Sequence, residues 1–567
     1  MTPIDGKADT ILSGGPIWCG LGLHVGPQGT AEALALRGGK VLAAGRLSDV
    51  EMLAGPGTRR IDLRGRLAIP AFHDAHMHLM SLGRRAKSLD ISPGAVSSVT
   101  DIVQLVGARA QSLAPGTWIT GSGYDHDRMV GKRHPTRWDL DKVSPDHPVW
   151  LGRCCGHMGV ANSAALKLAG ISRDTPNPPG GVIVRENGEP TGLLQERAQE
   201  AIREAMPAPK VEELVEAIEL AGQRCLSYGI GSVMDACVGM ISGWSDVAAY
   251  EAAERAGRLP VRVTMALGGG GLADIAEEAF AKGYLTGKGS GMLRVGPVKF
   301  FTDGSAGGCT AAMSKPYTNG ELGVLMFSDR ELDEMVGHYH HRGFQVAVHA
   351  IGDAAIDQTI RSFDNACADG TCSHRRHRIE HCGFIDERQM GEMQRLGLIP
   401  APQPVFVRDF GDTYLNVLGE QRSAGCYPMA RWQRRGLGPA MSSDTPVSDV
   451  NPFVNLYAAL ARTTLGGEVL GAEERLTLAE ALSAYTENGA YACGVDDRLG
   501  TLEPGKVADI AVLNGDPFQA GVADPRTSRA ISRCWRAGWC STDRVKCAEA
   551  SQLHSAAGCR GGGGLWQ

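Results

Sequence analysis

The most constraining feature of this chain is a set of polar residues that each close a short apolar run. Each run looks like a buried strand, and the polar residue stands where that strand would emerge. A (β/α)8 barrel brings the ends of its parallel strands to one face, which carries the chemistry in enzymes of this fold. The residues at these positions are His76, His78, Lys299, His349, His381 and Asp444.

The centre of the chain alternates strand-like runs with helical ones, as a parallel barrel requires. Helical patterns cover Lys210–Leu226, Ala354–Ala366 after an N-cap at Asp353, and Asp386–Leu396. Eight barrel strands are predicted in chain order: Leu67–Phe72, Ile230–Asp235, Val261–Leu267, Leu293–Phe301, Phe344–His349, His377–His381, Gly397–Gln403 and Gly438–Asp444.

Both ends of the chain are rich in short strands, which predicts a second, smaller domain. We expect an α/β protein in which a (β/α)8 TIM barrel, residues 70–494, carries a β-sandwich built from residues 8–69 and 495–545. Residues of about 80–228 form an insertion after the first barrel strand. An insertion at the catalytic end of a barrel is typical of a lid or a substrate-binding subdomain. The tail, 546–567, is expected to be flexible.

Composition excludes several classes of protein. The 567 residues are 43% hydrophobic, with a net charge of -6 and a pI near 6.3, so neither nucleic acid nor an anionic membrane is expected as a partner. No apolar stretch is long enough to span a bilayer, and the start lacks a signal peptide, which predicts a cytoplasmic protein. The 15 cysteines are irregularly spaced without a CxxC pair. They are interpreted as mostly buried thiols rather than disulfides or zinc ligands.

The histidines and the aspartate are candidate metal ligands, because hydrolytic metal sites use nitrogen and oxygen donors. His76 and His78 are two apart, so both can face the same side of an extended strand. Taken singly, an HxH pair also occurs by chance. His349 and His381 could be hydrogen-bonded core histidines, and Asp444 could cap a helix or turn. Their order at successive strand ends argues against these alternatives.

Lys299 is the least obvious member of the set. It stands between Val298 and Phe300, where a charged lysine would be costly to bury. One interpretation is a snorkelling or ion-paired lysine. The other is a lysine carboxylated by carbon dioxide, whose carboxylate bridges two cations.

Together these residues resemble the amidohydrolase superfamily, and are most similar to its YtcJ-like branch of metal-dependent hydrolases, which includes N-substituted formamide deformylase. Ala71 stands where the family usually has glycine. The resemblance covers about residues 8–540, and no counterpart is found for the tail. Supporting strings are VKFFTDGS (298–305), HAIGDAA (349–355), RIEH (378–381), SDTP (443–446) and GTLEPGKVAD (500–509).

The resemblance implies a binuclear centre and a reaction. His76 and His78 would bind one metal, and His349 and His381 the other, with carboxylated Lys299 as bridge. Asp444 would bind the first metal and move protons. The metals are expected to be two zinc ions, with manganese, iron or cobalt as alternatives. A metal-activated hydroxide would then cleave a non-peptide C–N bond of a small amide, formamide or cyclic amide. A homodimer is expected by analogy alone.

Substrate contacts are expected from the insertion and nearby loops. His157 resembles a histidine that this branch keeps near its active site, and could equally be a structural loop residue. Tyr124 and Phe406 could wall an apolar pocket, although aromatic side chains more often fill cores. Gln403, just after the seventh strand, is a candidate to hydrogen-bond a small-molecule substrate.

Two other functions are compatible with the sequence. The same centre could hydrolyse an ester or another bond, or the scaffold could serve a non-catalytic binding or regulatory protein. A degenerate relative should have lost metal ligands, and here all six positions are filled. The sequence therefore favours the enzyme.

Overall fold

The protein is represented by a computed structural model, which describes residues 6–21, 29–154, 158–178, 181–270, 273–368, 370, 372–514 and 531–535. It divides into two compact units: unit 1 comprises Met1–Leu79 and Gly222–Gln567, and unit 2 comprises Met80–Ala221. Every helix within the described ranges is too short or too polar to cross a bilayer. The predicted tail, 546–567, lies outside these ranges.

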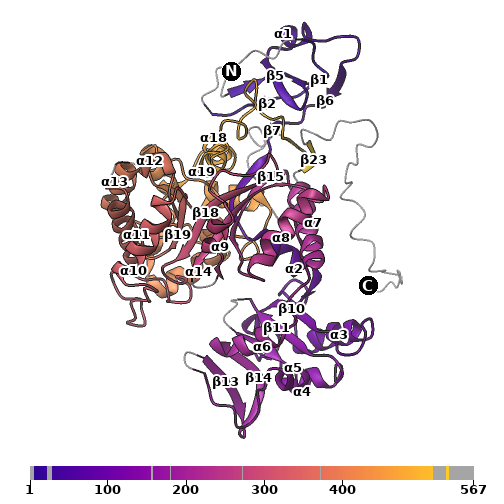
Figure 1. Ribbon diagram of the computed structural model, residues 1–567, viewed down its shortest axis with the longest axis vertical. Coiled ribbons are helices and arrows are strands. Elements are labelled where there is room, and N and C mark those ends of the chain that lie inside the picture. Colours follow the sequence, from indigo (N-terminus) through magenta and orange to yellow (C-terminus); the bar gives the residue numbers. More distant parts are fainter. Residues whose placement is uncertain are drawn as a thin grey trace, which may run out of the picture. The chain divides into compact units, whose positions relative to one another are not determined.

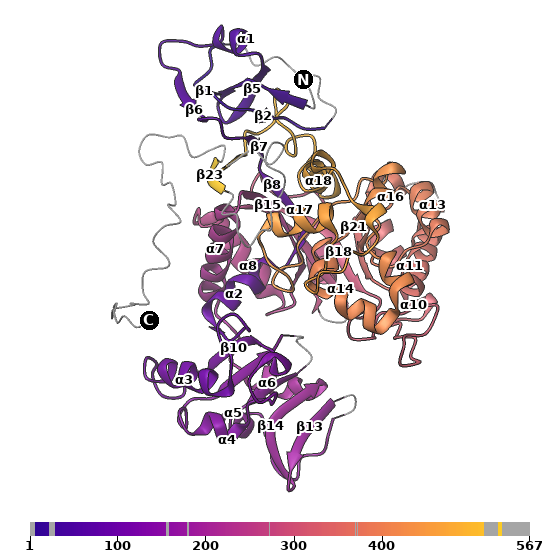
Figure 2. The same cartoon turned by 180° about the vertical axis from the view of Figure 1, so that it is seen from behind.

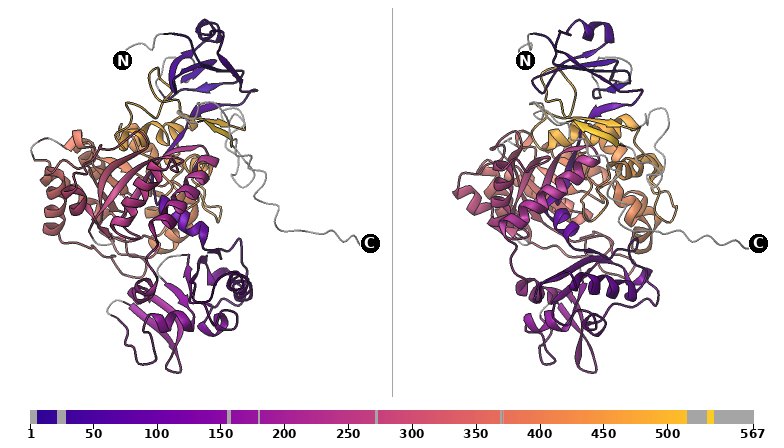
Figure 3. Two further views of the ribbon diagram at one scale, coloured as in Figure 1. Left: turned by 45° about the vertical axis from the view of Figure 1, so that its right-hand side comes forward. Right: turned by 90° about the vertical axis from the view of Figure 1, so that its right-hand side faces the viewer.

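Two β-sheets made from both ends of the chain share one apolar core in unit 1, where indigo and yellow strands lie together (Figure 3). Leu12 and Leu34 of one sheet and Ile17 and Ile510 of the other belong to this core. The predicted sandwich is therefore present. One sheet has the order β5 (Lys40–Gly45), β4 (Ala33–Arg37), β1 (Thr10–Ser13) and β6 (Arg59–Asp62), and the other β23 (Ile531–Trp535), β22 (Ile510–Leu513), β7 (Ala68–Pro70), β2 (Ile17–Trp18) and β3 (Thr30–Ala31).

A parallel sheet forms the barrel of unit 1, and its helices lie on the outside (Figures 1 and 2). Its strands are buried along almost their whole length, as expected for a sheet that is covered on both faces. The fold class predicted from the sequence is confirmed. The strands in sheet order are β8 (Phe72–Met77), β15 (Ile230–Val238), β16 (Arg262–Gly270), β18 (Leu293–Phe301), β19 (Val346–Ala350), β20 (Arg378–His381) and β21 (Ile399–Ala401).

The first predicted strand, Leu67–Phe72, is wrong, because the chain changes sheets inside that apolar run. Residues up to Pro70 pair with β22 of the sandwich. Ala71 then donates its N–H to Asp509 O at 2.9 Å, and the barrel strand begins one residue later. Ala71 fits here because its neighbour is Gly231: a Cβ at that glycine would lie 2.8 Å from the Ala71 Cβ.

The eighth predicted strand, Gly438–Asp444, closes the barrel without becoming a regular strand. Ala440 N donates to Pro400 O at 2.9 Å and Ser442 N to Pro402 O at 3.1 Å. Residues 400 and 402 are prolines and have no N–H to donate in return. Only the hydrogen bonds donated by residues 440 and 442 can therefore form on this side. On the other side, Asp444 N donates to His76 O at 2.8 Å and so connects this segment to the first barrel strand.

The helices of the barrel follow the predicted patterns closely. The first pattern becomes α7 (Val211–Ser227). The second becomes α11 (Asp353–Ala366), where Gly352, not Asp353, is the N-cap residue. The third becomes α13 (Glu387–Leu396), which begins at a capping box on Asp386. It ends at Gly397 with φ 67°, a left-handed conformation that glycine adopts without steric cost.

Unit 2 contains the insertion, which leaves the barrel strand directly after His78. Its sheet has the order β13 (Gly181–Glu186), β14 (Glu189–Glu196), β12 (Met158–Ala161), β11 (Val149–Arg153), β10 (Ile119–Tyr124) and β9 (Leu89–Asp90). Helix α3 (Val99–Ala110) packs on this sheet through Ile102 and Val106. The unit thus has a hydrophobic core of its own.

The cysteines differ from the expected pattern at one place. Cys367 and Cys372 form a disulfide, with their Cα atoms 5.1 Å apart. Among the other described cysteines most are buried thiols, and Cys154 is exposed. Cys367 is the C-cap residue of α11, and Cys372, five positions later, begins α12 (Cys372–Arg375).

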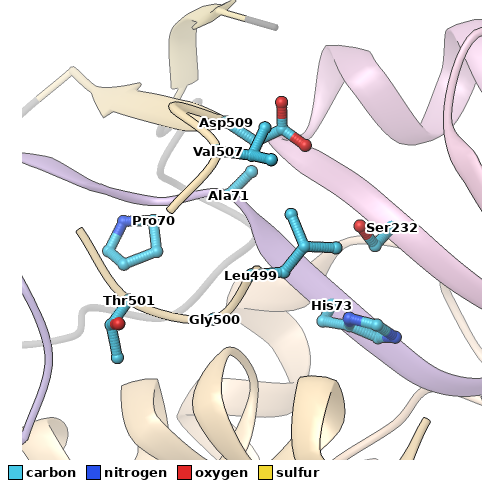
Figure 4. A pocket seen from close by; sticks show the side chains of 9 residues that line it. All are labelled: Pro70, Ala71, His73, Ser232, Leu499, Gly500, Thr501, Val507 and Asp509. Carbon is cyan, nitrogen blue, oxygen red and sulfur yellow. The ribbon is translucent and has the colours of Figure 1, made fainter. Parts of the chain in front are cut away.

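A small pocket lies where the chain passes from sandwich to barrel (Figure 4). Its volume is about 10 Å³, which is room for about one water molecule. His73 lies at this pocket with Ser232 and Asp509, and neither ring nitrogen of His73 has a partner among the described residues. Burial lowers the pKa of His73 to about 3, so the ring is neutral.

Candidate metal centre

Three candidate ligands converge at the end of the first barrel strand. His76 lies within β8 and His78 directly follows it, so their side chains share one side of the extended chain. Asp444 Oδ1 lies 3.4 Å from His76 Nε2 and 3.3 Å from His78 Nε2. The backbone holds this arrangement, because His78 N donates to Thr445 O at 2.8 Å.

The remaining two histidines lie beside this group. The ring centroids of His76 and His381 are 4.8 Å apart, and those of His381 and His349 are 4.4 Å apart. The two histidines come from the ends of neighbouring strands, β19 and β20. The closed barrel therefore brings together four imidazoles and one carboxylate, although β8 is not a neighbour of β19 or β20 in the sheet order.

Two of these residues have a conformation that side chains with a Cβ rarely adopt. His381 has φ 67° and Asp444 has φ 54°, both in the left-handed region. Such a conformation costs on the order of 1–3 kcal/mol and persists only where the surrounding structure imposes it. Here it turns the chain sharply at the strand end, at the point where the side chain must face the centre.

Hydrogen bonds select which nitrogen each histidine presents. Gln403 Nε2 donates to Ala401 O at 3.0 Å, which identifies the amide nitrogen and leaves Gln403 Oε1 to accept from His381 Nδ1 at 2.7 Å. His381 therefore presents Nε2. His349 Nε2 donates to the carbonyl of Gly304 at 3.1 Å, so this ring presents Nδ1. These second contacts orient metal-binding imidazoles in proteins generally.

Lys299 is fully buried beside the histidines. Its Nζ has no hydrogen-bond partner among the described residues. It lies 4.7 Å from the centre of the Phe301 ring. Burial lowers the pKa of this lysine and favours the neutral amine. A neutral amine is the form that reacts with carbon dioxide, so the environment fits the modification that the sequence suggested.

A buried ion pair, which the sequence pattern does not predict, orients His76. Glu380 accepts from His76 Nδ1 and, through Oε1, from Arg378 Nε at 2.7 Å. Arg378 also donates to Ala75 O at 2.8 Å, which ties β20 to β8. Burial lowers the pKa of His76, but Glu380 and Asp444 outweigh it and the net shift is upward. The sequence signal for this ion pair is the presence of two charged residues, Arg378 and Glu380, in the short strand β20.

Two buried aspartates also support the site and were not predicted. Asp303 accepts from the N–H groups of Ile351 and Gly352 at 3.0 and 2.8 Å, and its Oδ1 lies 3.3 Å from His349 Nε2. Asp74 accepts from Ser443 N at 3.1 Å and from the Tyr485 hydroxyl at 2.8 Å. Each ties one ligand-bearing segment to its neighbour.

The predicted substrate residues have different surroundings. Phe406, in α14 (Val405–Leu418), stacks on His381 with ring centroids 6.1 Å apart. Gln403 is fully buried and committed to His381. Tyr124 is buried in unit 2, where its hydroxyl lies 3.0 Å from His134 Nδ1. His157 lies outside the described residues.

The donor set fits a divalent cation. The ligand atoms of His76, His78 and Asp444 all lie within 4.8 Å of one another. Asp444 Oδ1 and Lys299 Nζ are buried polar atoms without a hydrogen-bond partner in the described part of the chain. Buried polar groups are normally paired, and a bound cation would satisfy Asp444 while the carboxylated lysine would satisfy Lys299.

Comparison with known proteins shows similarity to amidohydrolases over most of the chain. The chain is 32% identical over 502 residues to YtcJ of Bacillus subtilis, named as an amidohydrolase, covering 86% of this chain and 91% of the relative. It is 28% identical over 510 residues to N-substituted formamide deformylase of Arthrobacter pascens, covering 88% and 93%.

Solved structures show the same fold. A metal-dependent hydrolase from Pyrococcus furiosus superposes with a TM-score of 0.73 at 30% identity, covering 90% of this chain and 99% of that one. A second, from Pyrococcus horikoshii, superposes with a TM-score of 0.74 at 27% identity, covering 90% and 98%. The sequence profile described as the amidohydrolase family matches residues 59–540. With its candidate ligands gathered at the strand ends of this barrel, the chain belongs to the amidohydrolase family.

Proposed function

We propose that the protein is a metal-dependent hydrolase that cleaves a non-peptide C–N bond in a small amide, formamide or cyclic amide. The formamide deformylase, which is similar over most of its length, supports this substrate class. The single observation that carries the proposal is the grouping of His76, His78 and Asp444 beside a buried lysine amine that makes no hydrogen bond to the described part of the chain. Structural histidines and lysines have no need of such an arrangement.

The residues that would hold the metals follow from the nitrogen that each ring presents. His76 and His78, with Asp444, would hold one cation through nitrogen and oxygen donors. His381 Nε2 and His349 Nδ1 would hold a second. Lys299, once carboxylated on Nζ, would supply the carboxylate between them. We propose zinc, although the donor set also suits manganese, iron or cobalt.

Metal ions bound there would lower the pKa of a coordinated water and polarise the bond to be cleaved. We propose Asp444 as the residue that moves protons. Its Oδ1 faces both His76 and His78, and its backbone conformation holds the carboxylate at the centre. We propose that it accepts a proton from the attacking water and delivers that proton to the departing nitrogen. One carboxylate therefore acts first as base and then as acid.

The substrate would lie on the open side of the histidines. Phe406, stacked on His381, is proposed as one wall of the substrate site. Gln403 is proposed to act mainly through His381, because both ends of its amide are already bonded within the core. Substrate contacts from Tyr124 and His157, and a catalytic role of His157, remain predictions from the sequence.

A metal-reconstituted activity screen tests the proposal. Purified protein loaded with zinc or manganese, with added bicarbonate, is assayed on N-formyl amines, N-acyl amines and cyclic amides, each with the matching ester. We expect metal-dependent hydrolysis of at least one C–N substrate at a higher kcat/KM than its ester. Faster hydrolysis of the esters throughout would contradict the substrate class, and protein that binds no stoichiometric metal would contradict the enzyme itself.

A further inference from the structure

A large cavity lies at the opposite ends of the barrel strands, away from the candidate metal centre. Its volume is about 780 Å³, within the range of small-molecule sites. Arg294 is the second residue of β18, five residues before Lys299, which at the rise of a strand is a separation of about 16 Å. Gln345 likewise precedes β19, four residues before His349. The cavity is therefore separate from the metal centre.

The lining of this cavity is strongly basic. Four arginines and two aspartates border it: Arg294, Arg375, Arg376, Arg498, Asp496 and Asp497. One pair is internally neutralised, because Arg376 Nη1 lies 2.6 Å from Asp496 Oδ1. The remaining arginines exceed the remaining carboxylate, so the wall carries a net positive charge.

Two of these arginines have guanidinium N–H groups without an acceptor among the described residues. Arg294 donates to the carbonyls of Gly494 and Gly287 at 3.1 and 3.2 Å, but its buried Nε has no partner in the described ranges. The Arg498 guanidinium makes no hydrogen bond or ion pair to any residue that the structure describes. Burial and the nearby Arg498 charge both lower the pKa of Arg294. Two guanidinium groups thus lie close enough to repel each other, and the nearby Asp497 offsets this repulsion only in part.

Glycines keep the space beside these arginines open. Gly289 has φ 130°, and a Cβ there would collide with the carbonyl of Leu293. At Gly291 a Cβ would lie 3.7 Å from Arg262 Nη1 and 3.9 Å from Arg498 Nη1. Side chains at these positions would reduce access to the guanidinium groups.

We propose that this cavity binds a small-molecule oxyanion, a phosphate ester or a dicarboxylate, through Arg294 and Arg498. Guanidinium groups bind both kinds of oxyanion with paired hydrogen bonds, and a bound anion would relieve the repulsion between them. The cavity also contains Cys493, whose sulfur accepts from Arg378 Nη1 at 3.6 Å. Arg378 holds the glutamate that orients His76, so the occupant lies next to the supports of the metal centre.

Calorimetric titration of the metal-loaded protein tests this site. Inorganic phosphate and succinate serve as probes, each against chloride at equal ionic strength. We expect saturable binding of at least one, weakened about 10-fold or more in Arg498→Gln, which is about 1.4 kcal/mol of binding free energy. Tighter phosphate binding indicates a phosphate ester, and tighter succinate binding a dicarboxylate.

The variants separate this site from other anion sites. Arg498→Gln leaves every metal ligand in place, so anion binding at the metal centre would not respond to it. Arg330→Gln removes the same charge from an exposed arginine in α10 (Asp329–His341) and should bind like the unmodified protein. Binding that is equal in Arg498→Gln and the unmodified protein, or no saturable binding of either probe, would overturn the proposal.

Discussion

Two histidine-containing groups in this protein have similarly short distances between potential ligand atoms but differ in how those atoms are hydrogen-bonded. His76, His78 and Asp444 form one group, and His340, Cys367 and His377 form the other. In both, the potential ligand atoms lie within 4.8 Å of one another. Distance alone would therefore assign a metal to each.

The second group is already satisfied within the protein. His340 Nδ1 and His377 Nε2 are hydrogen-bonded at 2.8 Å, and His377 Nδ1 accepts from Val346 N at 2.9 Å. Cys367 is bonded to Cys372 and has no thiolate to offer. The first group, by contrast, leaves Asp444 Oδ1 and the neighbouring Lys299 Nζ without a hydrogen-bond partner among the described residues. Unsatisfied buried atoms, more than short distances, distinguish a site built for a ligand from a packed core.

The largest effect is expected from Lys299→Ala, which removes the proposed bridge. Bound metal and activity should be lost together, with kcat/KM falling below detection. Added formate or acetate should restore part of both, because a small carboxylate fits the space that the lysine leaves. Metal analysis and kinetics measure the two quantities. Lys299→Met fills the same space and should not be rescued; a fully active, metal-loaded Lys299→Ala would refute the bridge.

Asp444→Asn should lower kcat by about 10²–10⁴-fold, the usual contribution of a general acid or base. The amide retains the shape of the carboxylate, so the fold should survive, as circular dichroism can establish. Asp449→Asn is a matched control, since that aspartate is exposed five residues further along the chain. Equal activity in the two variants would rule out proton transfer by Asp444.

Glu380→Gln should weaken metal affinity by about 10–100-fold, as is typical when a contact that orients a ligand is lost. Competition with a chelator measures this affinity. Glu474→Gln is a matched control, because Glu474 is also buried and paired with an arginine, Arg431, outside the metal centre. If both variants bind metal equally, the ion pair with His76 has no part in holding the cation.

The smallest functional effect is expected from His377→Asn, which changes the second group. The variant should lose about 1–3 kcal/mol of stability at pH 7, because the N–H of Val346 loses its acceptor, with metal content unchanged. Denaturant unfolding and metal analysis measure the two quantities. Loss of metal would contradict the purely structural role of the group formed by His340, Cys367 and His377.

The same histidine predicts a dependence on pH. Burial lowers the pKa of His377 to about 3, below its ordinary 6.5. A pKa that is depressed on folding stabilises the protein above pH 6.5, and that stabilisation is lost as the pH falls towards 3. Unfolding curves should therefore show a loss of stability over this range that is smaller in His377→Asn. Identical pH profiles for the variant and the unmodified protein would contradict this assignment.

Much of the barrel could be predicted because its signals are local. The short apolar runs that end in His349 and His381 predict both a strand and its end from a few neighbouring residues. Gly397 likewise predicts the end of a helix. The crossing at Ala71 and the one-sided hydrogen bonding at Pro400 could not be read locally. An apolar run predicts a strand but not the sheet that the strand joins. A proline removes one backbone hydrogen-bond donor, and the effect depends on which strand lies on that side.

The sequence by itself determined the order of the barrel strands, the family and the six candidate ligands, because each depends on residue type and short spacing. The tertiary structure alone decided which atoms are satisfied. His76 and Glu380 are 304 residues apart in the chain and touch only because the barrel closes. The folded barrel leaves Lys299 Nζ without a hydrogen-bond partner among the described residues, pairs His377 with His340, and gathers arginines at the other end of the strands. Hydrogen bonding and charge act over a few ångströms in space, whatever the separation along the chain.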